Sequence, residues 1–71
     1  MNTQGVKYRG FILRPMAAFD TDGYAAIVIF ERDGNQRASG VLGQFQSPVC
    51  AREFALEHGK ARVDQQLASC Q

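Results

Sequence analysis

The residues that could support catalysis or metal binding are few and widely spaced in this chain. His58 is the only histidine. A general base needs an orienting carboxylate and a nearby nucleophile, and Glu57 points elsewhere because it is adjacent in sequence. Cys50 precedes His58 by a spacing that does not match a metal-ligand motif. We therefore expect no catalytic residue, no metal site and no cofactor, with His58 structural or at the surface and Cys50 buried as a small apolar residue.

Two glycine-containing stretches resemble ligand loops only in part. Residues 20–23, Asp-Thr-Asp-Gly, match the start of a calcium loop, but the following positions form an apolar run instead of further oxygen ligands. Gly40 and Gly43 lack the Gly-Lys-Ser/Thr ending of a phosphate-binding loop. We expect plain turns at both places, and the sequence predicts a protein that is not an enzyme.

Arginines interleaved with aromatic residues suggest a different chemistry. Rings can stack on bases and guanidinium groups can bind phosphates, which is how single-stranded nucleic acids are held. The candidate nucleic-acid-binding residues are Arg9, Arg14 and Arg37. The alternative is that these charges simply solvate the rim of a sheet.

Length, charge and hydropathy set the class of protein. Seventy-one residues with eight Lys/Arg and seven Asp/Glu make one small domain, residues 1–71, without bulk attraction to nucleic acid or anionic lipid. A chain this short buries only about 60% of its unfolded surface, so a partner would help. The polar N-terminus and a longest apolar run of seven residues predict no membrane association and a cytoplasmic location.

The apolar run at residues 24–30 lies between two turn signals and predicts a central strand. A first strand is expected over residues 8–14, ended by Pro15, with a flexible arm at residues 1–6. Residues 16–23 are expected to form a loop with Phe19 tucked under the sheet edge. Asp33-Gly34 predicts a hairpin turn into a third strand over residues 36–45, weakened by Ser39, Gly40 and Gly43.

Ser47-Pro48 predicts the start of a helix that extends to about residue 68, with Gly59 as its weak point and a possible bend. The side expected to pack on the sheet is a stripe formed by Cys50, Ala51, Phe54, Ala55, His58 and Ala61. Cys50 and Cys70 would lie roughly 30 Å apart along this helix, too far for a disulfide.

The predicted fold is α+β, a three-stranded antiparallel meander (β-β-β-α) with one C-terminal helix on one face. Residues 8–11 with Pro15, residues 23–29 and residues 51–64 resemble a group of small uncharacterised β-proteobacterial proteins, which implies this fold but gives no established activity. Gly40, Gly43, Ser47, Ala51 and Ala55 resemble the C-terminal part of double-stranded RNA-binding domains. That resemblance implies a similar shape, although Pro48 and Val49 stand where those domains carry lysines.

One helix can cover only one face of a sheet, yet both faces of the predicted central strand are apolar. Which face the helix covers is left open by the sequence. We expect the other face to bind a protein partner or a second copy of the chain, as a non-enzymatic interaction module. The candidate partner-binding residues are Tyr8, Ile12, Tyr24, Val28 and Phe30. Nucleic-acid binding through the same aromatic residues and the arginines is the alternative.

Overall fold

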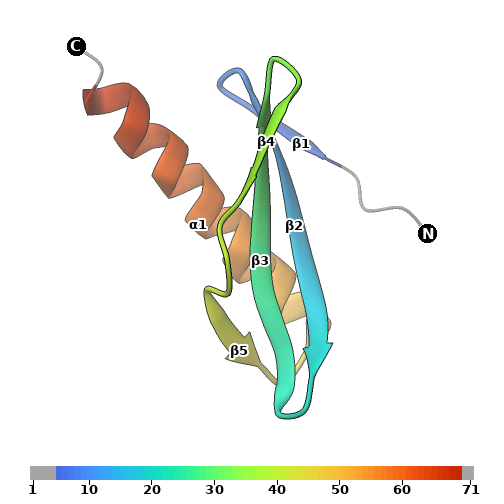
Figure 1. Ribbon diagram of the computed structural model, residues 1–71. Coiled ribbons are helices and arrows are strands. Elements are labelled where there is room, and N and C mark those ends of the chain that lie inside the picture. Colours follow the sequence, from blue (N-terminus) through green and yellow to red (C-terminus); the bar gives the residue numbers. More distant parts are fainter. Residues whose placement is uncertain (1–4, 70–71) are drawn as a thin grey trace.

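The computed structural model describes residues 5–69, which form one antiparallel sheet and one long helix (Figure 1). The elements in chain order are β1 (Val6–Tyr8), β2 (Phe11–Asp20), β3 (Gly23–Arg32), β4 (Asn35–Ala38), β5 (Gly43–Phe45) and α1 (Pro48–Ser69). The strand order is β1-β2-β3-β4, and β5 pairs with β3 beyond the end of β4. The predicted α+β meander with a single C-terminal helix is confirmed.

Tight turns with left-handed residues join the strands. Asp33 and Gly34, with φ of 53° and 83°, connect β3 to β4. A two-residue hairpin of this kind needs positive φ at both central positions, which glycine adopts freely and aspartate tolerates. Arg9 and Gly10, with φ of 50° and 91°, form the matching turn between β1 and β2. The first turn confirms the prediction from Asp33-Gly34. The second shows that the predicted strand over residues 8–14 is wrong, because the chain turns at Arg9 and Gly10, and that Val6 belongs to β1 and not to a flexible arm; residues 1–4 of that predicted arm lie outside the described residues.

β2 continues through Pro15, so the prediction that residues 16–23 form a loop is wrong. The reason is the position of β2 in the sheet. The carbonyls of Ala26 and Val28 accept hydrogen bonds from Leu42 and Ser39, on the side of β3 away from β2. The residues of β3 that hydrogen-bond to β2 are therefore the ones between these, such as Ile27. Pro15 pairs with Val28, so the backbone nitrogen of Pro15 points away from β3, toward the β1 edge of β2. A missing N–H costs nothing there, because β1 pairs only with residues 11–13.

The third predicted strand is divided into β4 and β5 by residues 39–42. The hydroxyl oxygen of Ser39 accepts a hydrogen bond from the Val28 N–H at 3.1 Å, and the hydroxyl donates to the Gly40 carbonyl at 2.8 Å. Gly40 has a φ of 81°. The prediction of one continuous strand over residues 36–45 is therefore wrong, although Ser39 and Gly40, two of the residues expected to weaken it, lie where it divides; Gly43 begins β5.

α1 begins where Ser47-Pro48 predicted it. The Ser47 hydroxyl oxygen accepts hydrogen bonds from the backbone N–H groups of Val49 at 3.1 Å and Cys50 at 3.5 Å. These are orphan donors of the first helical turn, which a serine cap satisfies. The helix then runs to Ser69 as one α-helix, and it lies across one face of the sheet (Figure 1). It is the longest helix in the described residues, and no helix there is both long and apolar enough to cross a membrane.

The helix packs on the sheet through residues spaced four apart. Ala51, Ala55, Gly59 and Val63 are buried, and the core also contains Phe11, Leu13, Ala26 and Val28 of the sheet. A Cβ atom placed on Gly59 would lie 3.1 Å from Val28 Cγ2 and 3.4 Å from Leu13 Cδ1. At Gly59, α1 therefore lies so close to the sheet that an added side chain would press against Val28 and Leu13.

The helix stripe predicted to face the core is wrong at its other members. Cys50 and Ala61 are exposed, and Phe54 is 41% exposed, with its ring 5.1 Å from that of Phe45. The prediction placed the large ring against the sheet and treated Gly59 as a defect. The close approach instead requires the smallest residues at the contact, so the rings lie beside it.

Candidate functional site

The face of the sheet opposite α1 is the candidate site. Val28 and Leu13 lie beneath the helix, so their neighbours in sequence point the other way. These neighbours come from the even positions of β2 and the odd positions of β3, which the strand pairing places side by side. We call this surface the open face, and its apolar part consists of Ile12, Met16, Ala18, Ala25, Ile27 and Ile29.

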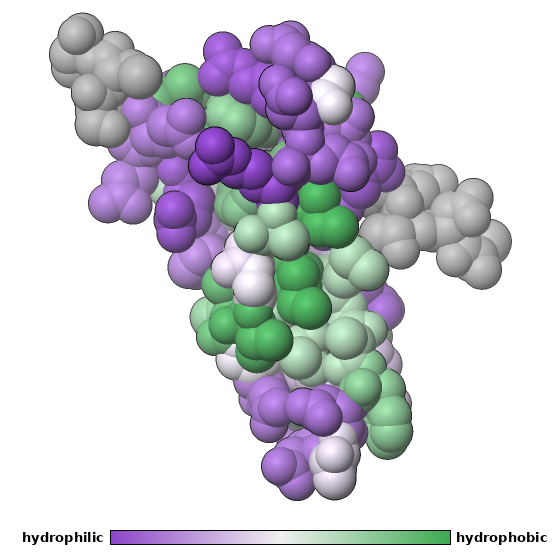
Figure 2. Space-filling view, viewed as in Figure 1, coloured by the Kyte–Doolittle hydropathy of each residue, from purple (hydrophilic) through white to green (hydrophobic). Residues whose placement is uncertain are grey.

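The apolar residues of the open face, apart from the buried Ala25, do not belong to the protein core. The core cluster and the partly buried residues packed against it include none of the six. Ile27 and Ile29 occupy the middle strand and remain partly accessible, and Met16, which pairs with Ile27, is 38% exposed. Figure 2 shows the apolar surface in the middle of this face, between more polar ends. No described element other than the sheet itself lies over it.

Polar networks border this apolar surface at both ends. At one end the Arg14 guanidinium donates to Glu31 Oε1 at 3.0 Å, and the Gln36 amide donates to the same oxygen at 3.3 Å. The hydrogen bond from Arg14, followed by that from Gln36, lowers the pKa of Glu31. At the other end the Gln44 amide donates to Asp20 at 2.8 Å. An apolar centre with a satisfied polar rim is the usual anatomy of a protein interface.

The predicted partner-binding residues do not form this surface. Val28 is fully buried beneath α1, and Tyr8, Tyr24 and Phe30 pack against the core on the helix side. Only Ile12 lies on the open face. Both sets of residues in β3 are apolar, so alternation alone could not show which set the helix covers. The helix covers the face of β3 that carries the aromatic residues, because its small residues pack on Val28 and Leu13, which lie on that face.

The three predicted nucleic-acid-binding arginines also lie apart. Arg9 is paired with Asp64 of the helix at 2.7 Å, and Arg14 is paired with Glu31 on the open face. Arg37 pairs with Phe30 in the sheet register and therefore lies on the helix side. The expected surface of arginines and aromatic rings on one exposed sheet face is therefore absent from the described part of the chain.

Arg9, Tyr8 and Asp64 instead tie the first hairpin to the helix. The Tyr8 hydroxyl donates to Asp64 Oδ1 at 2.8 Å. The hydrogen bonds from Arg9 and then Tyr8 lower the pKa of Asp64, and the bond to Asp64 raises the pKa of Tyr8. This cluster lies at the surface and has a structural role.

The remaining residues with reactive side chains are scattered. His58 is half-buried, with its ring stacked against Phe54 at 6.2 Å. Cys50 is exposed, contrary to the expectation that it is buried, and Cys70 lies outside the described residues. Asp20 accepts the N–H of Thr21 at 2.7 Å within the turn from β2 to β3. Residues 5–69 contain no group of three or more His, Cys, Asp or Glu side chains that could hold a metal ion.

Comparison with known proteins adds no functional information. No family model matches the chain, and no curated protein or solved structure is significantly similar to it. The two resemblances drawn from the sequence therefore stay predictions, and the function is argued from the open face alone.

Proposed function

We propose that the protein is a non-enzymatic interaction module that associates with a second copy of itself through the open face. The observation that carries this proposal is the position of Ile27 and Ile29. They lie in the middle strand of the sheet, on the side away from α1, and are not among the described residues that form the core cluster or pack against it. Covering apolar surface stabilises a complex by about 25 cal/mol per Å².

The size of the open face is suitable for a small dimer. β2 and β3 are ten residues each, which corresponds to a length of roughly 33 Å at about 3.3 Å per residue. Counting all thirty residues of the five strands, at about 3.3 Å along a strand and about 4.8 Å between strands, the face measures on the order of 500 Å² before its corrugation is counted. Weak, reversible interfaces bury less than about 600 Å² per partner, so the face is large enough for an interface of that kind.

Charge favours a second copy over a charged partner. Within residues 5–69, the ion pair on the open face, between Arg14 and Glu31, is internal to the chain. The other charges of this face, Lys7 beside Ile12 and Asp20 at the β2–β3 hairpin, lie at its edges, so two identical faces can bring their apolar centres together. A two-fold axis makes such an interface self-complementary, with each isoleucine able to meet the same surface on its mate. Nucleic-acid binding on this face is less well supported, because the aromatic rings of the sheet lie on its other side, which faces α1.

Sedimentation velocity across a range of protein concentrations tests the proposal. We expect reversible dimer formation by the natural chain and a monomer for Ile27→Lys, because a lysine ammonium in the interface would lose its water. Val49→Lys, at a 51% exposed position of α1, is the matched control and should still dimerise. If Ile27→Lys fails to fold by circular dichroism, Met16→Lys at the more exposed neighbouring position replaces it. A natural chain that stays monomeric at millimolar concentration would overturn self-association.

A further inference from the structure

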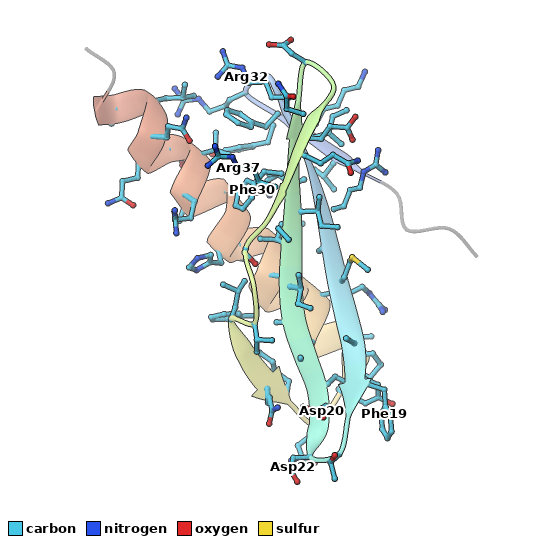
Figure 3. The ribbon with its side chains drawn as sticks, in the orientation of Figure 1. Phe19, Asp20, Asp22, Phe30, Arg32 and Arg37 are labelled. Carbon is cyan, nitrogen blue, oxygen red and sulfur yellow. The ribbon has the colours of Figure 1, made fainter. Side chains whose placement is uncertain are left out.

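A groove on the helix side of the sheet gathers positive charge. It lies between the β3–β4 hairpin and the C-terminal half of α1 and has a volume of about 530 Å³. Its lining includes Arg32 and Arg37 from the hairpin, Arg62 from the helix, and the rings of Phe11 and Phe30. We call it the arginine groove. Figure 3 shows Arg32, Arg37 and Phe30 at the end of the molecule away from the hairpin that carries Asp20 and Asp22.

The charge of the groove differs from that of the rest of the protein. Three arginines and one aspartate, Asp33, line it, which gives a local net charge of +2. The remainder of the chain carries five basic and six acidic side chains, so it is net −1, and the whole chain is +1. A nearly neutral protein thus concentrates its positive charge at one concave place, where walls of low dielectric constant strengthen the attraction for anions.

Two of the arginines are available to bind a ligand. Within residues 5–69, the ion pairs shorter than 4.0 Å involve only Arg9, Arg14 and Arg32, so Arg37 and Arg62 have no carboxylate partner there. They approach the groove from different elements, a strand and a helix. Guanidinium groups bind phosphate oxygens through two parallel hydrogen bonds, and arginine is preferred wherever such planar recognition is needed.

The third arginine offers a flat surface. The Arg32 guanidinium carbon lies over the Phe11 ring, 5.0 Å from its centre. The Arg32 side chain is still 53% exposed, so it remains accessible to a planar ligand. Phe30 is half-buried beside it. Aromatic rings stack on guanidinium planes and on phenylalanine with useful affinity.

From these contacts we propose that the arginine groove binds a small ligand in which a phosphate group is joined to a planar ring, that is, a mononucleotide or a compound of that chemistry. Arg37 and Arg62 hold the phosphate, and the ring stacks on Arg32 beside Phe30. The groove volume falls within the range of about 300–1,000 Å³ that is typical of small-molecule sites. The site is on the opposite side of the sheet from the open face and does not depend on self-association.

Titration with AMP, followed by NMR of the backbone amides, tests this site. We expect shifts concentrated at residues lining the groove, weakening as salt concentration rises. Arg37→Gln should weaken binding at least tenfold, whereas Arg52→Gln, an exposed charge on the N-terminal half of α1, should leave it unchanged. Shifts that are absent, that spread over the surface, or that respond equally to both variants would overturn the proposal.

Three further ligands show which chemical groups the arginine groove recognises. Inorganic phosphate and adenosine should each bind more weakly than AMP, because each supplies only one of the two groups. A mixed-sequence single-stranded oligonucleotide that binds while AMP does not would contradict a mononucleotide site and assign the groove to a nucleic-acid chain. Ile27→Lys should bind AMP as the natural chain does, so failure of the groove and failure of self-association are separate results.

Discussion

Replacing Gly59 by valine tests the packing on which the whole arrangement depends. A Cβ atom at this position lies 3.1 Å from Val28 Cγ2 and 3.4 Å from Leu13 Cδ1, and both of these side chains are fully buried. The valine methyl groups need still more space in the same layer. Forcing extra carbon atoms into a packed core costs about 1–3 kcal/mol.

Helix propensity acts in the opposite direction, so the sign of the measured change in stability shows which of the two effects is larger. Valine is better than glycine in a helix by roughly 0.4 kcal/mol, so propensity alone predicts that Gly59→Val stabilises the protein. With the packing cost included, we expect a net loss of about 0.6–2.6 kcal/mol. A domain of this size loses about 4–8 °C in Tm for each kcal/mol, so the change is readily measured.

The assay is urea denaturation followed by circular dichroism, with Ala61→Val as the control. Ala61 is an exposed residue of the same helix, and valine there should cost only about 0.6 kcal/mol through propensity. Gly59→Val should therefore be the less stable of the two variants. If it equals or exceeds the stability of the natural chain, α1 does not approach the sheet at Gly59, and the assignment of the two faces is wrong.

The remaining predictions concern the core, the surface cluster and a turn. Leu13→Ala should cost about 2–5 kcal/mol in denaturant titrations because it leaves a cavity under α1, whereas Met16→Ala on the open face should cost far less; equal losses would contradict the assignment of faces. The pKa of Asp64 is lowered in the fold, chiefly by the hydrogen bond from Arg9, so its contribution is present above the pKa of the unfolded state and is lost as pH falls through the lower folded value. Asp64→Asn should flatten the acid dependence of the urea midpoint below about pH 4, and an unchanged acid branch would argue against this contact. Gly34→Ala should cost about 1 kcal/mol because φ is 83° there, and a neutral result by thermal denaturation would indicate a different turn.

The sequence predicts the elements whose signals are local. Asp33-Gly34 satisfies the positive φ of the β3–β4 hairpin, and Ser47-Pro48 caps and starts α1, so both are correctly placed. Pro15 is misread as the end of a strand because its effect depends on which edge of β2 faces β3. That information comes from pairing with the rest of the sheet and is not contained in residues near Pro15.

The candidate site is only partly predictable for a similar reason. An uncovered apolar sheet face follows from one helix and a central strand that is apolar on both sides, but the strand gives no preference between Ile27 and Val28. The helix holds a usable signal: Ala51, Ala55 and Gly59 are small residues spaced four apart, which indicates a close contact. Even so, that signal identifies the face of the helix and not the face of the sheet, which is decided by how the elements pack together.

Contacts between copies of the chain test the central claim most directly. In a mixture of ¹³C-labelled and unlabelled protein, isotope-filtered NOE measurements detect only protons of one copy that lie close to another copy. We expect contacts from the methyl groups of Ile27, Ile29 and Met16 of one copy to the open face of its mate. An absence of such contacts at millimolar concentration, or contacts that come from the exposed helix residues Val49 and Phe54 instead, would contradict the assignment of the open face as the site of self-association.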